Sequence, residues 1–248
     1  MQTLKDQRAV VTGGSRGVGL GIVEALVAHG AHVTAVARTP GPLAEARHRL
    51  GIATTTGDVT DPAVAERVLR EVKPTILVLN AGAVPAMGPI HELSWEAFSR
   101  TWNTDVQAGL HWIQAAIRLP LPHGSRVIVS SSGAAISGSP LSGGYAGAKR
   151  MLWLMAGYAN QVGAALGIHF QTLVQRQIIG EGLAGLAGAE AYAARQGVSV
   201  ETFLAGFGAP LTPRQIGEHV ATLLTDARHA AGVAFGVKGD LGLHSLDT

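Results

Sequence analysis

A tyrosine, a lysine and a serine with chemically useful spacing lie in the segment 126–149. Lys149 follows Tyr145 by four residues, so on a helix the two side chains share one face. A nearby ammonium favours the phenolate form of tyrosine, which makes Tyr145 a usable proton donor to a substrate oxygen. Ser132 ends an apolar run thirteen residues before Tyr145, where its hydroxyl could hydrogen-bond that oxygen. The alternative is a helical surface ridge and a serine cluster that ends a strand, because this spacing also occurs by chance.

A glycine-rich stretch near the amino terminus has the features of a phosphate-binding turn. The segment 11–30 reads VTGGSRGVGLGIVEALVAHG, with Gly13, Gly17 and Gly19 among its glycines, and it follows the apolar run RAVV. Glycine lets a ligand approach the main chain closely, and the start of a helix offers unpaired N–H groups to an anion. A tight turn without a ligand would also use glycines. The position between a strand and a helix favours the phosphate site.

Short apolar runs that alternate with longer segments of helical spacing predict the scaffold. The runs are rich in valine and isoleucine and almost continuously apolar, which is typical of strands buried on both faces of a parallel sheet. The alternation indicates a doubly wound α/β fold. We expect one domain over residues 1–248, with about seven parallel strands and helices on both faces of the sheet. The expected strands lie in the segments 8–12, 31–37, 51–58, 75–82, 126–132, 168–174 and 232–237.

The stretch 180–208 interrupts this alternation directly after an expected strand. It is rich in alanine and glycine. Its place suggests a lid over a substrate site at the carboxyl ends of the strands, where open α/β sheets bind their ligands. Leu183, Leu186, Tyr192 and Phe203 would then face the substrate. An ordinary pair of surface helices is the alternative interpretation.

Composition restricts the other classes of protein. Of the 248 residues, 47% are hydrophobic and 15% charged, as expected for a globular chain with a large core. The formal net charge of +2 does not indicate nucleic-acid binding. The ten histidines show no metal-ligand spacing and cysteine is absent, so we expect no metal. The amino terminus lacks a signal-peptide pattern, so we expect a cytoplasmic location.

The uncharged segment 151–168 is long enough to cross a bilayer. Asn160 and Gln161 at its centre favour a helix buried against protein, and we expect no membrane partner.

Together the motifs resemble the short-chain dehydrogenase/reductase family. The pattern Gly-x-x-x-Gly-x-Gly after Thr12, GDVTD at 57–61, NAG at 80–82 and Tyr-x-x-x-Lys with its upstream serine occur in the family's order over most of the chain. The resemblance implies a Rossmann-like fold and hydride transfer between a nicotinamide cofactor and a carbonyl or alcohol, with Ser132, Tyr145 and Lys149 as catalytic residues. It also implies cofactor contacts at Gly13, Ser15, Gly17, Val18, Gly19, Asp58, Val59, Asn80, Ala81, Gly82, Tyr145 and Lys149.

The residues at the end of the second expected strand decide between the two nicotinamide cofactors. An Asp or Glu there would hold the adenosine ribose 2′-hydroxyl and repel a 2′-phosphate. This chain has Ala37 followed by Arg38, and Arg16 inside the glycine turn is a second basic candidate. We therefore expect NADP(H) as the cofactor. Two solvent-facing arginines without a ligand are the alternative.

Two positions depart from the family pattern. The family commonly has an asparagine in the helix after NAG, which links the lysine to solvent, and Asp105 aligns with it here. We predict that Asp105 replaces the asparagine in a proton relay, although its charge would favour the ammonium and oppose the tyrosinate. After the sixth strand the usual Pro-Gly is replaced by Gln175-Arg176. Ile178 could still offer backbone groups to the cofactor there.

The sequence as a whole predicts an NADP(H)-dependent carbonyl reductase that acts on a small to medium, partly apolar carbonyl or alcohol. The two departures leave one alternative from another class, a catalytically inactive NADP(H)-binding sensor or scaffold protein. The family resemblance and the uncharged segment 151–168 also predict a homodimer or homotetramer.

Overall fold

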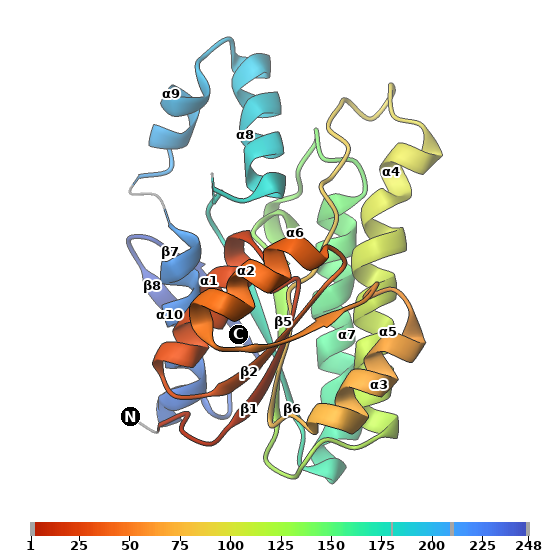
Figure 1. Cartoon of the computed structure of the whole chain (residues 1–248). Coiled ribbons are helices and arrows are strands. Elements are labelled where there is room, and N and C mark those ends of the chain that lie inside the picture. Colours follow the sequence, from red (N-terminus) through yellow and green to blue (C-terminus); the bar gives the residue numbers. More distant parts are fainter. Residues whose placement is uncertain (1–2, 180, 209–210, 247–248) are drawn as a thin grey trace.

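One twisted sheet runs through the centre of the molecule (Figure 1). A computed structural model describes residues 3–179, 181–208 and 211–246. The strand order of the eight-stranded sheet is β3-β2-β1-β4-β5-β6-β7-β8, and only the last pairing, β7 with β8, is antiparallel. The strands are β1 (Arg8–Thr12), β2 (His32–Ala37), β3 (Ala53–Thr56), β4 (Ile76–Leu79), β5 (Arg126–Ser132), β6 (His169–Gln175), β7 (Ala234–Lys238) and β8 (Gly242–Ser245).

The expected parallel strands are confirmed as β1–β7, and β8 is an addition that the sequence did not predict. This four-residue strand lies in the carboxyl-terminal tail and pairs Leu243 with Val237. It contains glycine and histidine, and its side chains are only partly buried or exposed. A short edge strand of this kind carries neither a continuous apolar run nor a clear alternation, which are the two patterns that reveal strands in a sequence.

Helices cover both faces of the sheet, as its apolar strands require. Neighbouring residues of one strand point to opposite faces, so Val11 packs with α1, α2 and α10 while Val10 packs with α3, α5 and α7. Figure 1 shows these two groups of helices on either side of the strands. The helices are α1 (Gly17–Ala28), α2 (Pro40–Leu50), α3 (Pro62–Val72), α5 (Gln107–Arg118), α7 (Tyr145–Leu166) and α10 (Pro213–Thr225).

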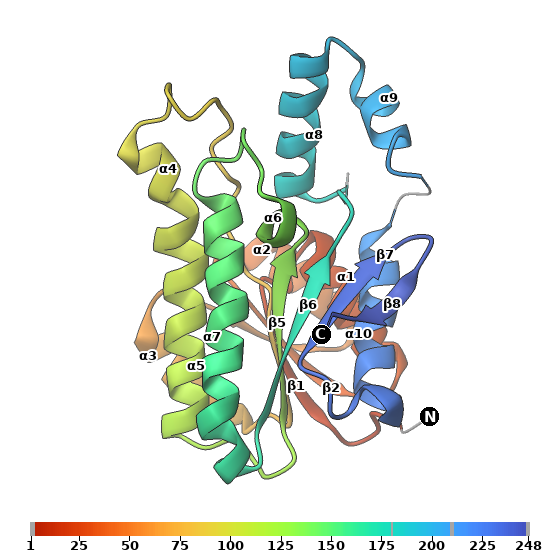
Figure 2. The same ribbon diagram turned by 180° about the vertical axis from the view of Figure 1, so that it is seen from behind.

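A further group of helical elements lies near the carboxyl ends of the parallel strands. Figures 1 and 2 show α8 and α9 standing above the body of the molecule at this end, with α4 at the same end. A short 3-10 helix, η2 (Ala227–His229), lies apart from this group and connects α10 to β7. The elements of the group are α4 (Trp95–Thr101), the π-helical turn η1 (Trp102–Val106), α6 (Ala134–Ser137), α8 (Leu183–Gln196) and α9 (Val200–Ala205).

The uncharged segment 151–168 forms most of the 22-residue helix α7. One side of α7 is buried against the sheet, where the Asn160 amide donates to the Phe170 carbonyl oxygen at 2.6 Å and accepts from its N–H at 2.8 Å. The other side is open, with Leu154 37% and Tyr158 55% exposed. The expected buried helix is therefore buried on one side only. Within the described part of the chain, no helix combines the length and hydropathy needed to cross a membrane.

Candidate active site

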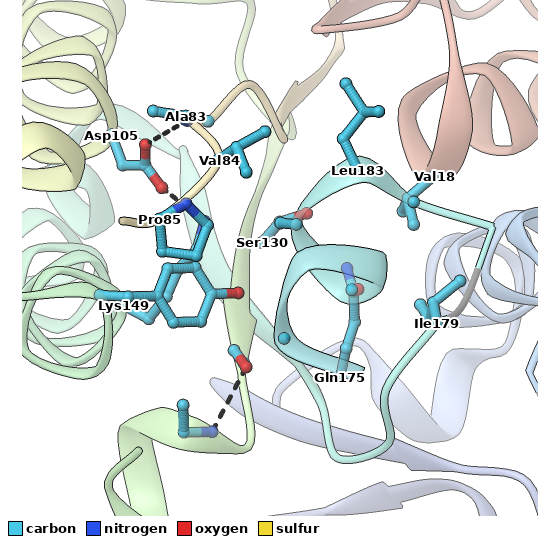
Figure 3. A pocket seen from close by; sticks show the side chains of 18 of the residues that line it. Val18, Ala83, Val84, Pro85, Asp105, Ser130, Lys149, Gln175, Ile179 and Leu183 are labelled. Atoms are coloured by element: carbon cyan, nitrogen blue, oxygen red, sulfur yellow. Dashed lines mark hydrogen bonds and ion pairs between the residues drawn. The ribbon is translucent and has the colours of Figure 1, made fainter. Parts of the chain in front are cut away.

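A large cavity opens at the carboxyl ends of the parallel strands. Its volume is about 1040 Å³, and its walls come from the strand ends, the first turns of α1 and α7, and α8 with the segment after it. Figure 3 shows Asp105 and Pro85 on one side of this pocket and Val18, Ile179 and Leu183 on the other. All residues that the sequence predicted for catalysis or cofactor binding line it: Gly13, Ser15, Arg16, Gly17, Val18, Gly19, Arg38, Asp58, Val59, Asn80, Ala81, Gly82, Asp105, Ser132, Tyr145, Lys149 and Ile178.

The glycine-rich turn forms a cradle that has no room for side chains. A Cβ atom on Gly13 would lie 2.9 Å from the Ala81 Cα atom, and one on Gly19 would lie 2.1 Å from the Gly13 carbonyl oxygen. Gly13 also has a φ of +68°, which an L-residue adopts only with strain. At the start of α1, Arg16 occupies the N-cap position without a side-chain hydrogen bond. The first N–H groups of α1 are thus available to an anion.

Polar side chains below the cradle tie three strand ends together. The Thr12 hydroxyl donates to the Val78 carbonyl oxygen at 3.3 Å and accepts from the N–H groups of Asn80 and Ala81 at 3.0 and 3.2 Å. The Ser130 hydroxyl donates to the Asn80 side-chain oxygen at 3.3 Å. Ser130 is not among the residues that the sequence predicted for this site. The two-residue period of a strand could have predicted it, because residues two apart point to the same face and Ser130 therefore shares one face of β5 with Ser132.

The end of β5 and the start of α7 position three predicted catalytic residues, Ser132, Tyr145 and Lys149. Ser132 is the last residue of β5, Tyr145 is the first residue of α7, and Lys149 follows one turn later. The Lys149 Nζ atom lies 5.6 Å from the centre of the Tyr145 ring. The Ser131 hydroxyl donates to the Lys149 carbonyl oxygen at 2.9 Å, which holds this turn of α7 against the strand end.

The Lys149 ammonium forms a buried ion pair with Asp105. Lys149 Nζ and Asp105 Oδ2 are 3.0 Å apart, and the side chains are 9% and 0% exposed. Asp105 Oδ1 accepts a hydrogen bond from the Ala83 N–H at 2.8 Å. A Cβ atom on Gly82 would lie 2.7 Å from Asp105 Oδ2, so the carboxylate needs a glycine at this position. Asp105 lies in the π-helical turn η1, a distortion that often occurs at functional sites.

Opposing effects act on the pKa of Lys149. Burial is the largest and lowers the pKa, because the charged form loses its hydration. The charge of Asp105, the Tyr145 hydroxyl when ionised and the hydrogen bond to Asp105 together outweigh burial, so the pKa lies above the ordinary lysine value. Lys149 therefore stays a cation beside Tyr145.

The part of the cavity where the sequence predicts the adenosine of the cofactor has two exposed cations and a carboxylate that accepts hydrogen bonds. Arg16 and Arg38 are both exposed and line the cavity. The Thr60 N–H and hydroxyl donate to Asp58 Oδ1 at 2.9 and 2.8 Å. These hydrogen bonds, with a smaller effect of the Arg38 charge, hold the pKa of Asp58 below its ordinary value. Among the described residues, no group of three or more His, Asp or Glu side chains is placed to hold a metal.

The segment that departs from the family pattern after β6 is held by the carboxyl-terminal strands. Arg176 Nη1 donates to His244 Nε2 on β8 at 3.0 Å, and the Gly239 N–H donates to the Gln177 side-chain oxygen at 3.1 Å. Gln175 and Ile178 line the cavity on either side of these anchors. No local sequence pattern predicts these two hydrogen bonds, because each of them joins residues more than sixty positions apart.

The predicted lid forms α8 and α9 and contributes part of the cavity wall. Leu183, Tyr192 and Phe203 line the cavity as expected. Leu186 was expected there too, but this side chain is 40% exposed and lies outside the lining residues. Phe207, which the sequence analysis did not single out, lines the cavity instead. Gly180, the first residue of the predicted lid, lies outside the described residues.

The ion pair leads to a stability prediction. Asp105→Ala would leave the buried ammonium unpaired and should lower the free energy of unfolding at pH 7 by about 3–5 kcal/mol. Because the folded-state pKa of Lys149 is raised, the contribution of the pair is complete below the unfolded lysine pKa of about 10.4 and is lost as the pH rises through the folded value. The difference in the free energy of unfolding between the parent chain and the variant, measured by urea unfolding, should therefore decrease at alkaline pH.

Asp240→Ala provides the control for this measurement, because it removes the carboxylate of an exposed Lys238–Asp240 pair at 3.2 Å. We expect little change in its unfolding midpoint. An equally small change for Asp105→Ala would contradict the role of the buried pair.

Comparisons with known proteins agree with the fold. A blue fluorescent protein from a metagenomic library, solved in complex with NADPH, superposes with a TM-score of 0.73 at 26% identity, covering 96% of this chain and 98% of that chain. L-xylulose reductase from Homo sapiens is 37% identical over 116 residues, 46% of this chain and 48% of that protein. Carbonyl reductase (NADPH) 2 from Sus scrofa is 35% identical over 118 residues, 47% of this chain and 48% of that protein.

The chain spans about half the length of the curated relatives that it matches. The sequence model of the short chain dehydrogenases matches more of it, from residue 7 to residue 173, and includes the glycine cradle, Asp105, Ser132, Tyr145 and Lys149. This match covers more than half of the chain and confirms the resemblance seen in its motifs, so the protein belongs to the short-chain dehydrogenase family.

Proposed function

We propose that this protein is an NADP(H)-dependent carbonyl reductase. The observation that carries the proposal is that Ser132, Tyr145 and Lys149 line the same cavity as the glycine-rich cradle, with the Lys149 ammonium against the Tyr145 ring. The names of the relatives, which describe reductases of a ketose and of carbonyl compounds, support this reaction class.

The cradle fits a dinucleotide cofactor. Gly13 and Gly19 let the turn pack closely against Ala81 and against itself, where a Cβ atom would collide, and the uncapped start of α1 can bind a phosphate group. When bound, NADPH supplies a hydride to the carbonyl carbon of the substrate. The further contacts that we propose for the cofactor are Ser15, Gly17, Val18, Asp58, Val59, Asn80, Ala81, Gly82, Tyr145, Lys149 and Ile178.

Arg16 and Arg38 support NADP(H) over NAD(H). Both are exposed at the cavity, and the buried Ala37 before Arg38 brings no carboxylate that would repel a 2′-phosphate. A hydrogen bond from a guanidinium to phosphate contributes about 1.5–3 kcal/mol, roughly ten- to a hundredfold in affinity. The NADPH bound by the structural neighbour is consistent with this choice.

Ser132, Tyr145 and Lys149 carry out the proton chemistry of the proposed reduction. The Tyr145 hydroxyl donates a proton to the carbonyl oxygen as the carbon is reduced, which gives the alcohol. Ser132 hydrogen-bonds the same oxygen and stabilises its developing negative charge. The Lys149 cation stabilises the phenolate that remains on Tyr145. In the reverse direction Tyr145 accepts the alcohol proton.

Asp105 takes the place of the family's asparagine through direct contact with Lys149. Its carboxylate orients the ammonium beside Tyr145, and Ala83 fixes the carboxylate in turn. We propose Asp105 as a positioning residue that also links Lys149 to the proton relay.

The intact set of Ser132, Tyr145 and Lys149 favours an enzyme over the inactive sensor or scaffold. The reductase names of the relatives give that alternative no support. We propose that residues 180–208 act as the substrate lid of a single domain over residues 1–248, and that the substrate is a small carbonyl compound or alcohol. The cytoplasmic location stays a prediction from the sequence.

A homodimer or homotetramer would cover the open side of α5 and α7, which lie side by side in Figures 1 and 2. Leu154, Tyr158 and Val162 are spaced four residues apart on α7 and are 37%, 55% and 52% exposed. Leu110 on α5 is 42% exposed. An apolar stripe of this kind favours contact with a second copy of the chain.

Tyr145→Phe tests the proposed enzyme directly. Removing the proton donor should lower kcat for NADPH-dependent reduction of aldehydes and ketones about a hundredfold or more, while NADPH binding changes little. The control is Tyr158→Phe, which makes the same chemical change at an exposed position of the same helix. Tight NADPH binding without turnover in the parent chain would support the sensor instead.

Asp105→Asn tests the relay. The amide keeps the size and one acceptor but loses the charge beside Lys149, so we expect a lower kcat and a shifted pH profile with a nearly unchanged KM. Asp61→Asn, at the exposed N-cap of α3, is the matched control because asparagine caps helices equally well. An unchanged rate and pH profile for Asp105→Asn would exclude Asp105 from the relay.

The double variant Ala37→Asp/Arg38→Ala tests the cofactor preference. A carboxylate in place of the cation should repel the 2′-phosphate and shift the NADPH/NADH ratio of kcat/KM toward NADH by roughly a hundredfold. Arg47→Ala removes an exposed arginine of α2 that does not line the cavity and should leave the ratio unchanged. If the double variant keeps the parent ratio, the NADP(H) proposal is wrong.

A further inference from the structure

Three aromatic side chains of the lid form one wall of the cavity. The rings of Tyr192 on α8 and Phe203 on α9 are stacked, with centroids 6.0 Å apart and planes 9° from parallel. Phe207 meets Phe203 edge to face, at 5.3 Å and 74°. All three residues line the cavity. We call Tyr192, Phe203 and Phe207 the aromatic wall.

Hydrogen bonds anchor the aromatic wall to the segment that leads into Tyr145. The Leu141 N–H donates to the Tyr192 hydroxyl at 3.2 Å, and the Ser139 hydroxyl lies 2.8 Å from the same oxygen. The Ser142 N–H donates to the Ser139 carbonyl oxygen and the Tyr145 N–H to the Ser142 carbonyl oxygen, each at 3.1 Å. The polar end of Tyr192 is thus bound by protein, and its ring contributes apolar surface at a fixed place relative to Tyr145.

Further apolar side chains lie around the aromatic wall. Val84, Ile136 and Leu183 line the cavity and are 36%, 51% and 52% exposed, and Phe207 is 37% exposed. Figure 3 shows Val84 and Leu183 at the same pocket, on segments far apart in the sequence. Large apolar side chains that stay open to solvent inside a concave site indicate a ligand that buries them.

The hydroxyl protons of two serines that line the cavity are already donated within the protein. The Ser137 hydroxyl donates to the Gly133 carbonyl oxygen at 3.2 Å, and the Ser142 hydroxyl donates to that of Ser139 at 3.1 Å. Among the described lining residues the carboxylates are Asp58 and Asp105, which bind Thr60 and Lys149. Gln175, Gln196, Arg100 and Thr104 also line the cavity and can meet a polar substituent of the substrate.

This distribution disfavours a polyhydroxylated substrate. Each sugar hydroxyl that is buried without a partner lowers affinity by roughly ten- to a hundredfold. A flat ring meets no such penalty, and it gains from stacking on aromatic side chains.

We infer that the substrate is a flat, mainly apolar ketone or aldehyde, of which an aryl ketone is the simplest case. Its ring packs on the aromatic wall while its carbonyl oxygen meets Tyr145 and Ser132. The inference rests on the proposed carbonyl reductase function and names the substrate class of that site, in contrast to the ketose named for a relative.

Three ketones assayed with NADPH and the full chain test the inference. They are acetophenone, cyclohexyl methyl ketone, which has the same size without a flat ring, and a ketopentose. We expect kcat/KM for acetophenone to exceed that for cyclohexyl methyl ketone about tenfold and that for the ketopentose about a hundredfold or more.

The double variant Phe203→Leu/Phe207→Leu keeps apolar volume but removes two rings of the aromatic wall. It should lower kcat/KM for acetophenone about tenfold, mainly through KM, and change that for cyclohexyl methyl ketone less than about twofold. Leu186→Ala, on the same lid but outside the cavity wall, is the control and should change neither value. An unchanged dissociation constant for NADPH shows that the variants are folded.

The outcomes separate the two proposals. Two results would overturn the inference and leave the proposed carbonyl reductase in place. One is a kcat/KM for the ketopentose as high as that for acetophenone. The other is a double variant whose kcat/KM values for acetophenone and cyclohexyl methyl ketone equal those of the parent chain. If no carbonyl compound is reduced although NADPH binds, the proposed function fails, and the inferred substrate class fails with it.

Discussion

The buried contact between Lys149 and Asp105 is the constraint on which the arrangement of the site depends. An ammonium removed from water is costly unless a negative group compensates its charge. Asp105 lies 3.0 Å away and provides this compensation. Several local features are needed to bring the carboxylate there, namely the π-helical turn η1, the Ala83 N–H and the lack of a side chain at Gly82.

The same contact connects two segments within one helical layer of the fold. Asp105 belongs to the segment that continues into α5, whereas Lys149 belongs to α7, and both helices cover the same face of the sheet. The Ser131 hydroxyl joins the Lys149 main chain to β5. On the other side of the cavity, Thr12 and Ser130 tie the ends of β1, β4 and β5 beneath the glycine cradle. The two halves of the site are thus fixed to the same strand, β5.

The departures from the family pattern have structural counterparts elsewhere in the chain. Where Pro-Gly is missing after β6, the Arg176 guanidinium is held by His244 and the Gln177 amide by the Gly239 main chain. The antiparallel strand β8 therefore supports the cavity wall from the far end of the sequence. Helices α8 and α9 add a third element, whose aromatic wall is anchored at Ser139 and Leu141, close in sequence to Tyr145.

The sequence by itself determined the parts of this protein that depend on local patterns. Continuous apolar runs predicted β1–β7, the glycines predicted a cradle that Gly13 and Gly19 form by main-chain contact, and the four-residue spacing placed Tyr145 and Lys149 on one helical face. Tertiary structure alone decided that the expected influence of Asp105 on Lys149 is a direct ion pair, that β8 extends the edge of the sheet, and that Phe207 lines the cavity in place of Leu186. These contacts join segments whose relative positions result from the packing of whole helices and strands, and periodicity within a single segment carries no information about that packing.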